Sequence, residues 1–412
     1  MKRYQRTAFP QYLIVGTLIL IAIGIGLGST MIMTNVQFED YFVIPWAAGR
    51  GWLLEGQNPY DPAIIDLART TLAETEFLGK IPETEVLEQP LVTLFLYLPF
   101  SLIPYRYSRA IWMSLQVISV LLIGYISLKI SGWKVSNVEL FIAIFLILAW
   151  LPGSSVIING QLIPIVLLLI FASILLLING QDTTAGFFLA LTFGSFESTF
   201  LIITFLLIWS ISRRRWAVLG AYFAGVGFLM AISIILLPNW VLNWFGVLLQ
   251  RFDQWQTLRT PLMTLSNALP GIAPYLVIVL HVGVLITMLF IWIKKTGKAE
   301  KEFVWKILIT LVLICLIHIQ AKLHHLLFVV PGMFFVFRFW TDRWGLFGRG
   351  LSWLFFASIV ILPWVNILES IDFSRDLNMP TLLIGYPILV VIGMIWVRWW
   401  AVNVPQLPFE RE

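Results

Sequence analysis

The chain has little charge and almost no cysteine. Only 12% of its 412 residues are charged, while 59% are hydrophobic. Soluble domains carry about 25% charged residues, and no soluble core of this size could bury so much apolar surface. The composition therefore excludes a soluble enzyme and predicts a polytopic membrane protein. The single cysteine, Cys315, excludes an intrachain disulfide.

Signatures of several soluble enzyme classes are also missing. The sequence has no P-loop, GxGxxG, GxSxG or HExxH motif, so nucleotide-sugar chemistry on a soluble Rossmann domain is not expected. It has no internal repeat, which leaves an inverted-repeat transporter without support. The basic residues lie between apolar segments instead of forming one patch, so we expect no nucleic-acid partner.

Long apolar runs are the main feature that is present. A membrane crossing needs about 20 apolar residues, and we expect one all-α integral-membrane domain over 1–412, a bundle of about 11–13 transmembrane or re-entrant helices. Residues 91–103 are too short to cross and predict a re-entrant segment. Residues 184–211 are too long for one crossing and predict a helical hairpin. The remaining runs predict crossings at 11–33 (an uncleaved first span), 110–128, 136–152, 156–178, 217–237, 272–293, 303–321, 324–340, 350–368 and 380–399.

Basic loops orient these spans. By the positive-inside rule, the N-terminus, Arg213–Arg215, Lys294–Lys301 and Arg338–Arg349 are expected inside. Alternation then puts the intervening loops outside, including 34–90, 239–262 and 369–379. The loop 34–90 carries ten acidic residues against three basic ones, and we expect an acidic outer cap. Interfacial helices are predicted within it at 46–54 and 63–78, with another outer interfacial segment at 239–262.

Two acids open the outer loop, Glu39 and Asp40. One of them could act as a general base that takes a proton from an acceptor hydroxyl. The alternative is a solvated span end. Because neighbouring residues point in different directions, only one of the pair is expected to be the base.

His324 and His325 lie at an outer span start, close after Lys322. This cluster could bind a lipid phosphate or stabilise a leaving group. The alternative is a pair of interfacial histidines. The spacing supports no metal site, and the need for a divalent metal stays open.

Other polar residues interrupt the outer ends of apolar runs. Asn159 and Gln161 could bind sugar hydroxyls or belong to a helix-capping turn. Glu197 lies near the tip of the predicted hairpin, either as a functional acid or as an exposed tip residue. Arg251 and Arg259 could hold a phosphate or pyrophosphate, or could snorkel at the interface.

Together, the order of these motifs resembles a known family. An acid follows the first span, then come GQNPYD at 56–61, QPL at 89–91, GQ at 160–161, RRRW at 213–216 and the paired histidines. Over residues 10–345 the chain resembles the GT-C class of integral-membrane glycosyltransferases, and most closely glycosyltransferase family 87. That family includes polyprenol-phosphate-mannose-dependent mannosyltransferases.

The resemblance implies a function. It implies transfer of a sugar, a hexose such as mannose, from a polyprenyl-phosphate donor to a lipid or glycan hydroxyl, with inversion. The site would lie on the outer face of a bacterial inner membrane. Asp40 would be the base, and His324 or His325 would lie near the donor phosphate. Substrate contacts would come from Glu39, Tyr60, Asn159, Gln161, Glu197, Arg251, Arg259 and Lys322, with no resident cofactor or metal assigned.

The sequence departs from the family pattern at the hairpin tip. Family members usually carry a lysine there, whereas this tip reads TFGSFES at 192–198. The positive charge would then come from Lys322, Arg251 or Arg259. Two other functions stay open: a transporter or lipid flippase, and a catalytically inactive protein of the same fold.

Overall fold

The computed structural model describes most of the chain. The described residues are 16, 20, 24, 28–29, 31–82, 87–250, 261–262, 273–293, 300–318, 322–365, 372–373 and 380–402. Its elements run in the following order: β1 (Gln37–Glu39), α2 (Val43–Glu55), α3 (Ala63–Ala73), β2 (Gly79–Lys80), α4 (Leu91–Leu94), α5 (Leu98–Ser101), α6 (Tyr105–Ser131), α7 (Asn137–Ala149), α8 (Leu151–Ile158), α9 (Ile163–Ile178), α10 (Asp182–Leu191), η1 (Phe193–Ser195), α11 (Phe196–Ser212), α12 (Trp216–Leu236), α13 (Trp240–Gln250), α15 (Ala273–Ile293), α16 (Glu300–Ile317), η3 (Leu323–Val329), α17 (Val330–Val365), β3 (Asp372–Phe373), α18 (Pro380–Val397) and η4 (Arg398–Val402).

Long apolar helices dominate the fold, which confirms an all-α polytopic membrane protein. Among the described residues, five helical segments are long and apolar enough to cross a bilayer, and the pair α7 and α8, bent by 58°, would make a sixth. The five are Tyr105–Ser131, Trp216–Leu236, Tyr275–Ile293, Leu323–Val365 and Leu382–Trp400.

The predicted hairpin at 184–211 is confirmed. Helices α10 and α11 meet at the short turn η1, and Glu197 lies in the first turn of α11. The segment 91–103 forms the two short helices α4 and α5, each of four residues. Helices of this length cannot cross a bilayer, and this shape fits the predicted re-entrant segment.

Several helix boundaries differ from the prediction. The apolar run 156–178 is divided, because α8 ends at Ile158 and α9 begins only at Ile163. Helix α3 stops at Ala73 instead of 78 because the chain turns into strand β2. The predicted division between the runs 324–340 and 350–368 is confirmed, because α17 consists of two helices that meet at a break at Gly345 (φ 57°, ψ −127°). Most of the predicted first span 11–33 lies outside the described residues.

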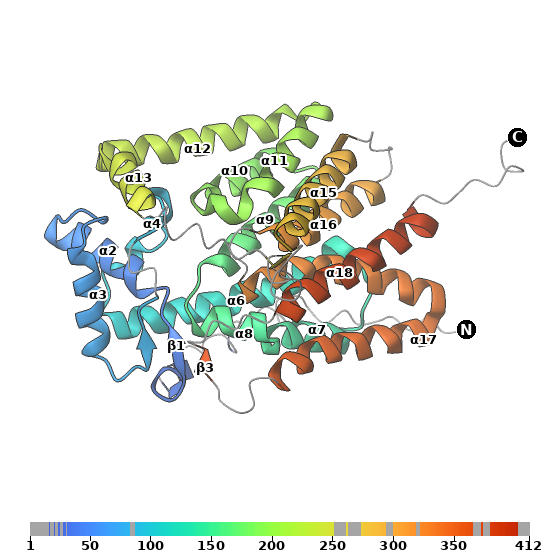
Figure 1. The fold of residues 1–412 in the computed structure, drawn as a ribbon, viewed down its shortest axis with the longest axis horizontal. Helices are drawn as coiled ribbons and strands as arrows, with labels where there is room; N and C mark the ends of the chain where they lie inside the picture. The colour runs from blue at the N-terminus through green and yellow to red at the C-terminus, as the bar shows by residue number, and fades with distance from the viewer. Residues whose placement is uncertain are drawn as a thin grey trace, which may run out of the picture.

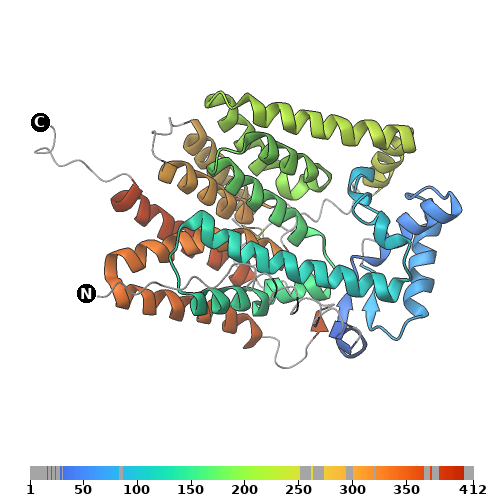
Figure 2. The same ribbon diagram turned by 180° about the vertical axis from the view of Figure 1, so that it is seen from behind.

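The helices run side by side between two distinct ends (Figures 1 and 2). One end carries the three strands with α2, α3, α4 and α13, at the left of Figure 1. At the other end, Arg338 Nη1 donates to the Ser131 carbonyl at 3.1 Å, so Lys129 and Lys134 share an end with the basic loop 338–349. Among the described residues, the acidic loop 34–90 and α13 thus lie at one end, and the basic stretch 338–349 lies at the other.

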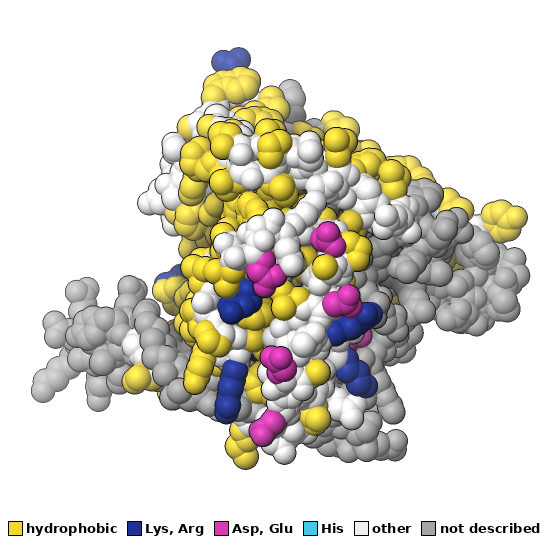
Figure 3. All heavy atoms as spheres, turned by 90° about the vertical axis from the view of Figure 1, so that its left-hand side faces the viewer, with side chains coloured by type: hydrophobic (Ala, Val, Ile, Leu, Met, Phe, Trp, Pro, Cys, Tyr) yellow, Lys and Arg dark blue, Asp and Glu magenta, His cyan; other side chains and the backbone are white. Residues whose placement is uncertain are grey.

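A small parallel sheet closes the first end. Strand β1 pairs with β2 on one side and with β3 on the other, in the order β2-β1-β3. The sheet joins the acidic loop 34–90 to residues 372–373, more than 330 positions later in the chain. Figure 3 views this end and shows acidic and basic side chains gathered across it. The exposed charged residues there include Glu55, Asp61, Asp66, Arg69, Glu74, Glu76 and Lys80.

Candidate active site

Asp40 lies at the centre of the candidate site, directly after β1. Its backbone N–H donates to the Lys80 carbonyl at 2.8 Å, which fixes it to strand β2. Its side chain is 0% exposed. Oδ1 accepts the Phe42 N–H at 2.9 Å, while Oδ2 accepts the Tyr105 hydroxyl and Arg109 Nε at 3.2 Å. Burial of a charge requires such partners, and Arg109 is equally buried.

Helix α6 delivers both partners of Asp40 because Tyr105 and Arg109 lie four residues apart on one helix face. The helix begins after Pro104, whose extended backbone starts the first turn. The same face continues with Trp112 and Gln116, and these side chains reach the turn that separates α8 from α9.

The turn at 158–161 supports α6 through its backbone. The carbonyl of Ile158 accepts Arg109 Nη2 at 2.5 Å, and that of Gly160 accepts Trp112 Nε1 at 3.0 Å. The Gln161 carbonyl accepts Gln116 Nε2, and the Asn159 carbonyl accepts the N–H of Tyr41 at 2.9 Å. Four consecutive carbonyls thus accept hydrogen bonds from three side chains of α6 and from the backbone of Tyr41.

Gly160 is required in this turn for two reasons. Its φ is +70°, which favours glycine. A Cβ at this position would lie 3.0 Å from Arg109 Cζ and 3.1 Å from Phe42 Cβ. The Gly-Gln motif therefore packs directly against the buried guanidinium. Sugar binding by the side chains of Asn159 and Gln161 stays a prediction, and the buried Gln161 Oε1 has no hydrogen-bond partner.

Aromatic rings enclose the ion pair. Phe42 lies 5.1 Å from Trp112 and 5.8 Å from Tyr97, and Tyr97 stacks on Trp112 at 4.7 Å. Burial and the negative charge of Asp40 raise the pKa of Tyr97 well above its ordinary value, so its phenol stays protonated. This apolar shell strengthens the electrostatic interactions of Asp40 by excluding water.

Glu39 faces a different set of partners. The Tyr41 hydroxyl donates to Glu39 Oε2 at 2.5 Å, and Lys322 Nζ donates to the Tyr41 hydroxyl at 3.3 Å. The ammonium of Lys322 also lies 4.7 Å from the centre of the Tyr41 ring. Tyr41 follows Asp40 directly in the sequence. Its side chain thus connects the acidic loop to Lys322, the residue before η3.

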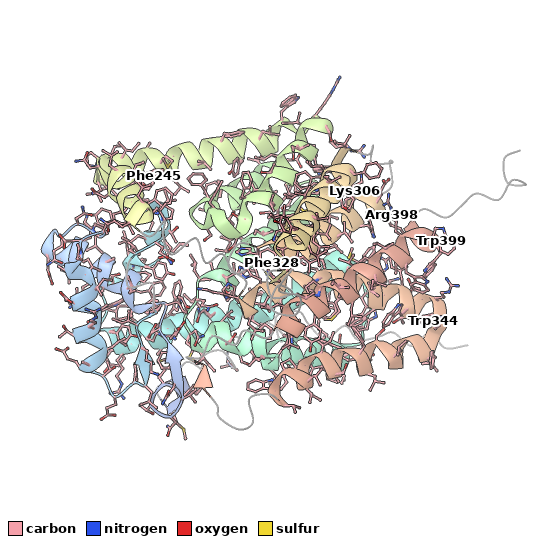
Figure 4. All side chains as sticks on the ribbon, viewed as in Figure 1. Phe245, Lys306, Phe328, Trp344, Arg398 and Trp399 are labelled. Atoms are coloured by element: carbon pink, nitrogen blue, oxygen red, sulfur yellow. The ribbon has the colours of Figure 1, made fainter. Side chains whose placement is uncertain are left out.

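The two predicted histidines form a stack with a third. The ring of His325 lies 4.2 Å from that of His324 and 3.6 Å from that of His318, which follows α16. His325 Nδ1 accepts the Lys322 N–H at 3.2 Å, while its buried Nε2 has no hydrogen-bond partner. Nearby Phe328 lies in the middle of the molecule (Figure 4). In the described part of the chain, no three His, Cys, Asp or Glu side chains could hold a metal ion.

The remaining predicted site residues are not brought to Asp40 by any described contact. Tyr60 donates its hydroxyl to the Gln89 carbonyl at 3.2 Å, and burial raises its pKa above the ordinary value. It fastens the turn 58–61 to the segment before α4. The backbone of Glu197 lies in the first turn of α11. Arg251 and Arg259 lie outside the described residues.

The sequence reasoning missed Tyr105, Arg109 and His318. Arg109 stands at the start of an apolar run, where a basic residue usually marks a span end. The available signal was the spacing of Tyr105, Arg109, Trp112 and Gln116, which places four polar or aromatic groups on one face of a helix.

Fold and site together define an integral-membrane protein with a buried acid, Asp40, whose neighbour Tyr41 is linked through Lys322 to a cluster of three histidines. The model of glycosyltransferase family 87 matches residues 89–318, more than half of the chain. The chain belongs to this family and is a glycosyltransferase. The match contains Arg109, the turn 158–161 and His318, whereas Asp40 and the His324–His325 pair lie outside it. No curated protein and no solved structure matches the chain.

Proposed function

We propose that this glycosyltransferase moves a hexose, with mannose the first candidate, from a polyprenyl-phosphate donor to a lipid or glycan hydroxyl. The transfer occurs at the outer face of the membrane and inverts the anomeric configuration. Asp40 is the general base. The donor phosphate binds near Lys322, His324 and His325.

One observation carries this proposal: a series of contacts links Tyr41, the residue after Asp40, to Lys322 and His325. Asp40 and Tyr41 are consecutive residues, and Tyr41 accepts a hydrogen bond from Lys322. Lys322 in turn donates its N–H to His325. A single displacement needs a base and a stabilised leaving group on either side of the anomeric carbon. The contacts through Tyr41 and Lys322 support an arrangement in which both kinds of group serve one site.

The proposed step balances as a direct displacement. Asp40 takes the proton of the acceptor hydroxyl while the acceptor oxygen forms a bond to the anomeric carbon. The bond from that carbon to the phosphate oxygen breaks, and the polyprenyl phosphate leaves with the electron pair. Lys322 and the histidines stabilise the negative charge that develops on the phosphate.

The hydrogen bonds of Asp40 indicate which oxygen does this work. Oδ2 already accepts two donors, from Tyr105 and Arg109, whereas Oδ1 accepts only the Phe42 N–H. A carboxylate oxygen has two acceptor positions, so Oδ1 retains one for the acceptor hydroxyl. Because Asp40 is fully buried, the proposal requires that substrate binding open a path to Oδ1.

Lys322 supplies the charge that the hairpin tip lacks. The tip at 192–198 contains no basic residue, yet a phosphate leaving group needs a cation or strong donors. Lys322 contacts Tyr41, the residue after Asp40, and its backbone N–H donates to His325. A lipid-linked donor would also account for a site at the end of a membrane-spanning bundle.

A transfer assay with the purified protein in lipid vesicles tests the proposal. Radiolabelled polyprenyl-phosphate mannose, glucose and arabinose are offered in turn, with a membrane lipid extract as the acceptor. We expect one labelled glycolipid whose anomeric configuration is opposite to that of the donor. Donor binding without any product would instead indicate an inactive protein, and movement of the donor across the bilayer without transfer would indicate a flippase.

The substitution Lys322→Gln tests the phosphate contact. We expect kcat/KM for the lipid donor to fall about tenfold or more, because a charge-assisted hydrogen bond contributes about 1.5–3 kcal/mol. Most of the loss should appear as a higher KM for the donor. The matched control is Lys80→Gln, an exposed lysine of the same end, which should leave the kinetics unchanged. Equal kinetics in both variants would remove Lys322 from the site.

A further inference from the structure

Tyr41 makes contacts with three different parts of the chain. Its backbone N–H donates to the Asn159 carbonyl at 2.9 Å, in the turn that also accepts hydrogen bonds from α6. Its hydroxyl donates to Glu39 Oε2 at 2.5 Å and accepts from Lys322 Nζ at 3.3 Å. The same ammonium lies over the face of the Tyr41 ring, 4.7 Å from the ring centre. The backbone of Tyr41 is therefore fixed, while its side chain holds a lysine from a distant part of the sequence.

The ring and the hydroxyl of Tyr41 together restrict the side chain of Lys322. A lysine has a long flexible stem and loses much rotamer freedom when a ligand orders it. A ring face attracts the ammonium, and a hydroxyl acceptor fixes the direction of one of its N–H groups. Because Tyr41 orders Lys322 before any ligand arrives, a ligand that binds this ammonium meets a smaller entropic cost.

Glu39 strengthens the contact between Tyr41 and Lys322 through the shared hydroxyl. A hydroxyl that donates to a carboxylate becomes a better acceptor, because hydrogen bonds in a chain polarise one another. The Glu39 carboxylate and the Lys322 ammonium lie at the two ends of such a chain, with the Tyr41 oxygen between them. Glu39, the acid next to the proposed base, therefore helps to place the lysine without contacting a substrate itself.

Tyr41 also sets the position of Lys322 relative to the proposed base. Asp40 and Tyr41 are joined by one peptide bond, which places their Cα atoms about 3.8 Å apart. Both backbones are fixed, since the Asp40 N–H donates to the Lys80 carbonyl at 2.8 Å and the Tyr41 N–H donates to the Asn159 carbonyl. A displacement requires that the base and the group that stabilises the leaving group keep a set geometry. A tyrosine that follows the base directly and contacts the lysine meets this requirement.

We propose that Tyr41 is a positioning residue that holds Lys322 for the phosphate of the lipid-linked donor. This role rests on the proposed function, because it requires the donor phosphate to bind near Lys322. Glu39 acts through the Tyr41 hydroxyl, and neither residue touches the reacting atoms. The unit of Glu39, Tyr41 and Lys322 thus sets the phosphate-binding charge at a fixed place beside the residue that carries the base.

Binding of undecaprenyl phosphate to the full-length protein in detergent micelles tests this role. The probe carries the leaving group without a sugar, so the result does not depend on which sugar is transferred. Undecaprenol, which lacks the phosphate, is the reference ligand. We expect Tyr41→Leu to raise the Kd of undecaprenyl phosphate about tenfold, as Lys322→Gln does, since a charge-assisted hydrogen bond contributes about this factor. Tyr41→Phe keeps the ring and should raise this Kd about threefold. The Kd of undecaprenol should stay unchanged in all three variants.

Tyr125 supplies the matched control. Its ring contacts Lys129, with the ammonium 5.3 Å from the ring centre, at the end of the bundle that carries the basic stretch 338–349. Tyr125→Leu removes the same kind of contact and should leave both Kd values unchanged. The double variant Tyr41→Leu, Lys322→Gln should bind undecaprenyl phosphate as Lys322→Gln alone does, because Tyr41 acts only through Lys322.

The outcomes separate this role from the proposed function. If Lys322→Gln weakens binding of the phosphate and Tyr41→Leu does not, the phosphate contact stands and the positioning role is overturned. Additive losses in the double variant also overturn it, because Tyr41 then acts without Lys322. Equal losses for undecaprenyl phosphate and undecaprenol would mean that Tyr41 only supports the fold. If the wild type binds both lipids equally, the proposed phosphate site fails and the positioning role fails with it. If Tyr41→Leu does not fold, Tyr41→Phe decides by the same comparisons.

Discussion

Replacing Arg109 by glutamine is expected to destabilise the protein by about 3–5 kcal/mol, because it leaves a buried carboxylate without its cation. Asp40 and Arg109 are both 0% exposed and lie 3.2 Å apart. Glutamine would also lose the contact of Arg109 Nη2 with the Ile158 carbonyl. The loss should appear as a lower unfolding temperature in detergent or nanodiscs.

A double-variant cycle separates the ion pair from the shape of the side chains. In Arg109→Gln with Asp40→Asn both charges are absent, so no buried charge remains unpaired. We expect this double variant to be clearly more stable than either single variant. Arg106→Gln, at an exposed position one turn earlier on α6, should unfold like the wild type. If the losses of the two single variants simply add in the double variant, the ion pair is not what stabilises this end.

The helices could be predicted from the sequence because their apolar length is a local property. The hairpin of α10 and α11 and the helices α12, α15 and α18 all follow from runs of about 20 apolar residues or from a run too long for one crossing. Helix α6 is longer than predicted. It begins at Tyr105 instead of 110, because Tyr105 and Arg109, on one face of its first turns, are buried against Asp40.

Breaks within apolar runs were harder to predict. The turn at 158–161 interrupts the run 156–178, and its signal is one glycine between two amides. The mean hydropathy over a span-length window stays high across this turn, because apolar residues flank it on both sides. The break at Gly345, by contrast, agrees with the prediction of two separate spans at 324–340 and 350–368, because a stretch rich in basic residues divides those two apolar runs.

For the site, the sequence indicated the residue types but not their contacts. It indicated an acid after the first span and a histidine pair after Lys322, and the structure links the two segments through the contact of Tyr41 with Lys322. It could not indicate that Arg109 pairs with Asp40, since the two are 69 positions apart. Nor could it indicate the carbonyls of 158–161 as acceptors, because every residue carries a carbonyl and only the fold decides which ones point at α6.

Asparagine at position 40 is expected to lower transfer about 100- to 10,000-fold, the usual contribution of a general base. The change keeps the size of the side chain and removes its capacity to take a proton. An amide has one acceptor oxygen, whereas the Asp40 carboxylate uses two, toward Phe42 on one side and toward Tyr105 and Arg109 on the other. The variant therefore also loses some stability, and the assay has to distinguish lost chemistry from lost folding.

Three comparisons make that distinction. Donor binding should persist in Asp40→Asn, because the proposed phosphate contacts come from Lys322 and the histidines, so the loss should fall on kcat. The double variant with Arg109→Gln should regain stability while transfer stays absent, since no carboxylate returns. Asp66→Asn, in the same acidic loop and exposed, should transfer like the wild type. If Asp40→Asn retains more than a tenth of the wild-type rate, Asp40 is an anchor for Arg109 and the base lies elsewhere, with Glu39 beside Tyr41 and Lys322 the next residue to replace.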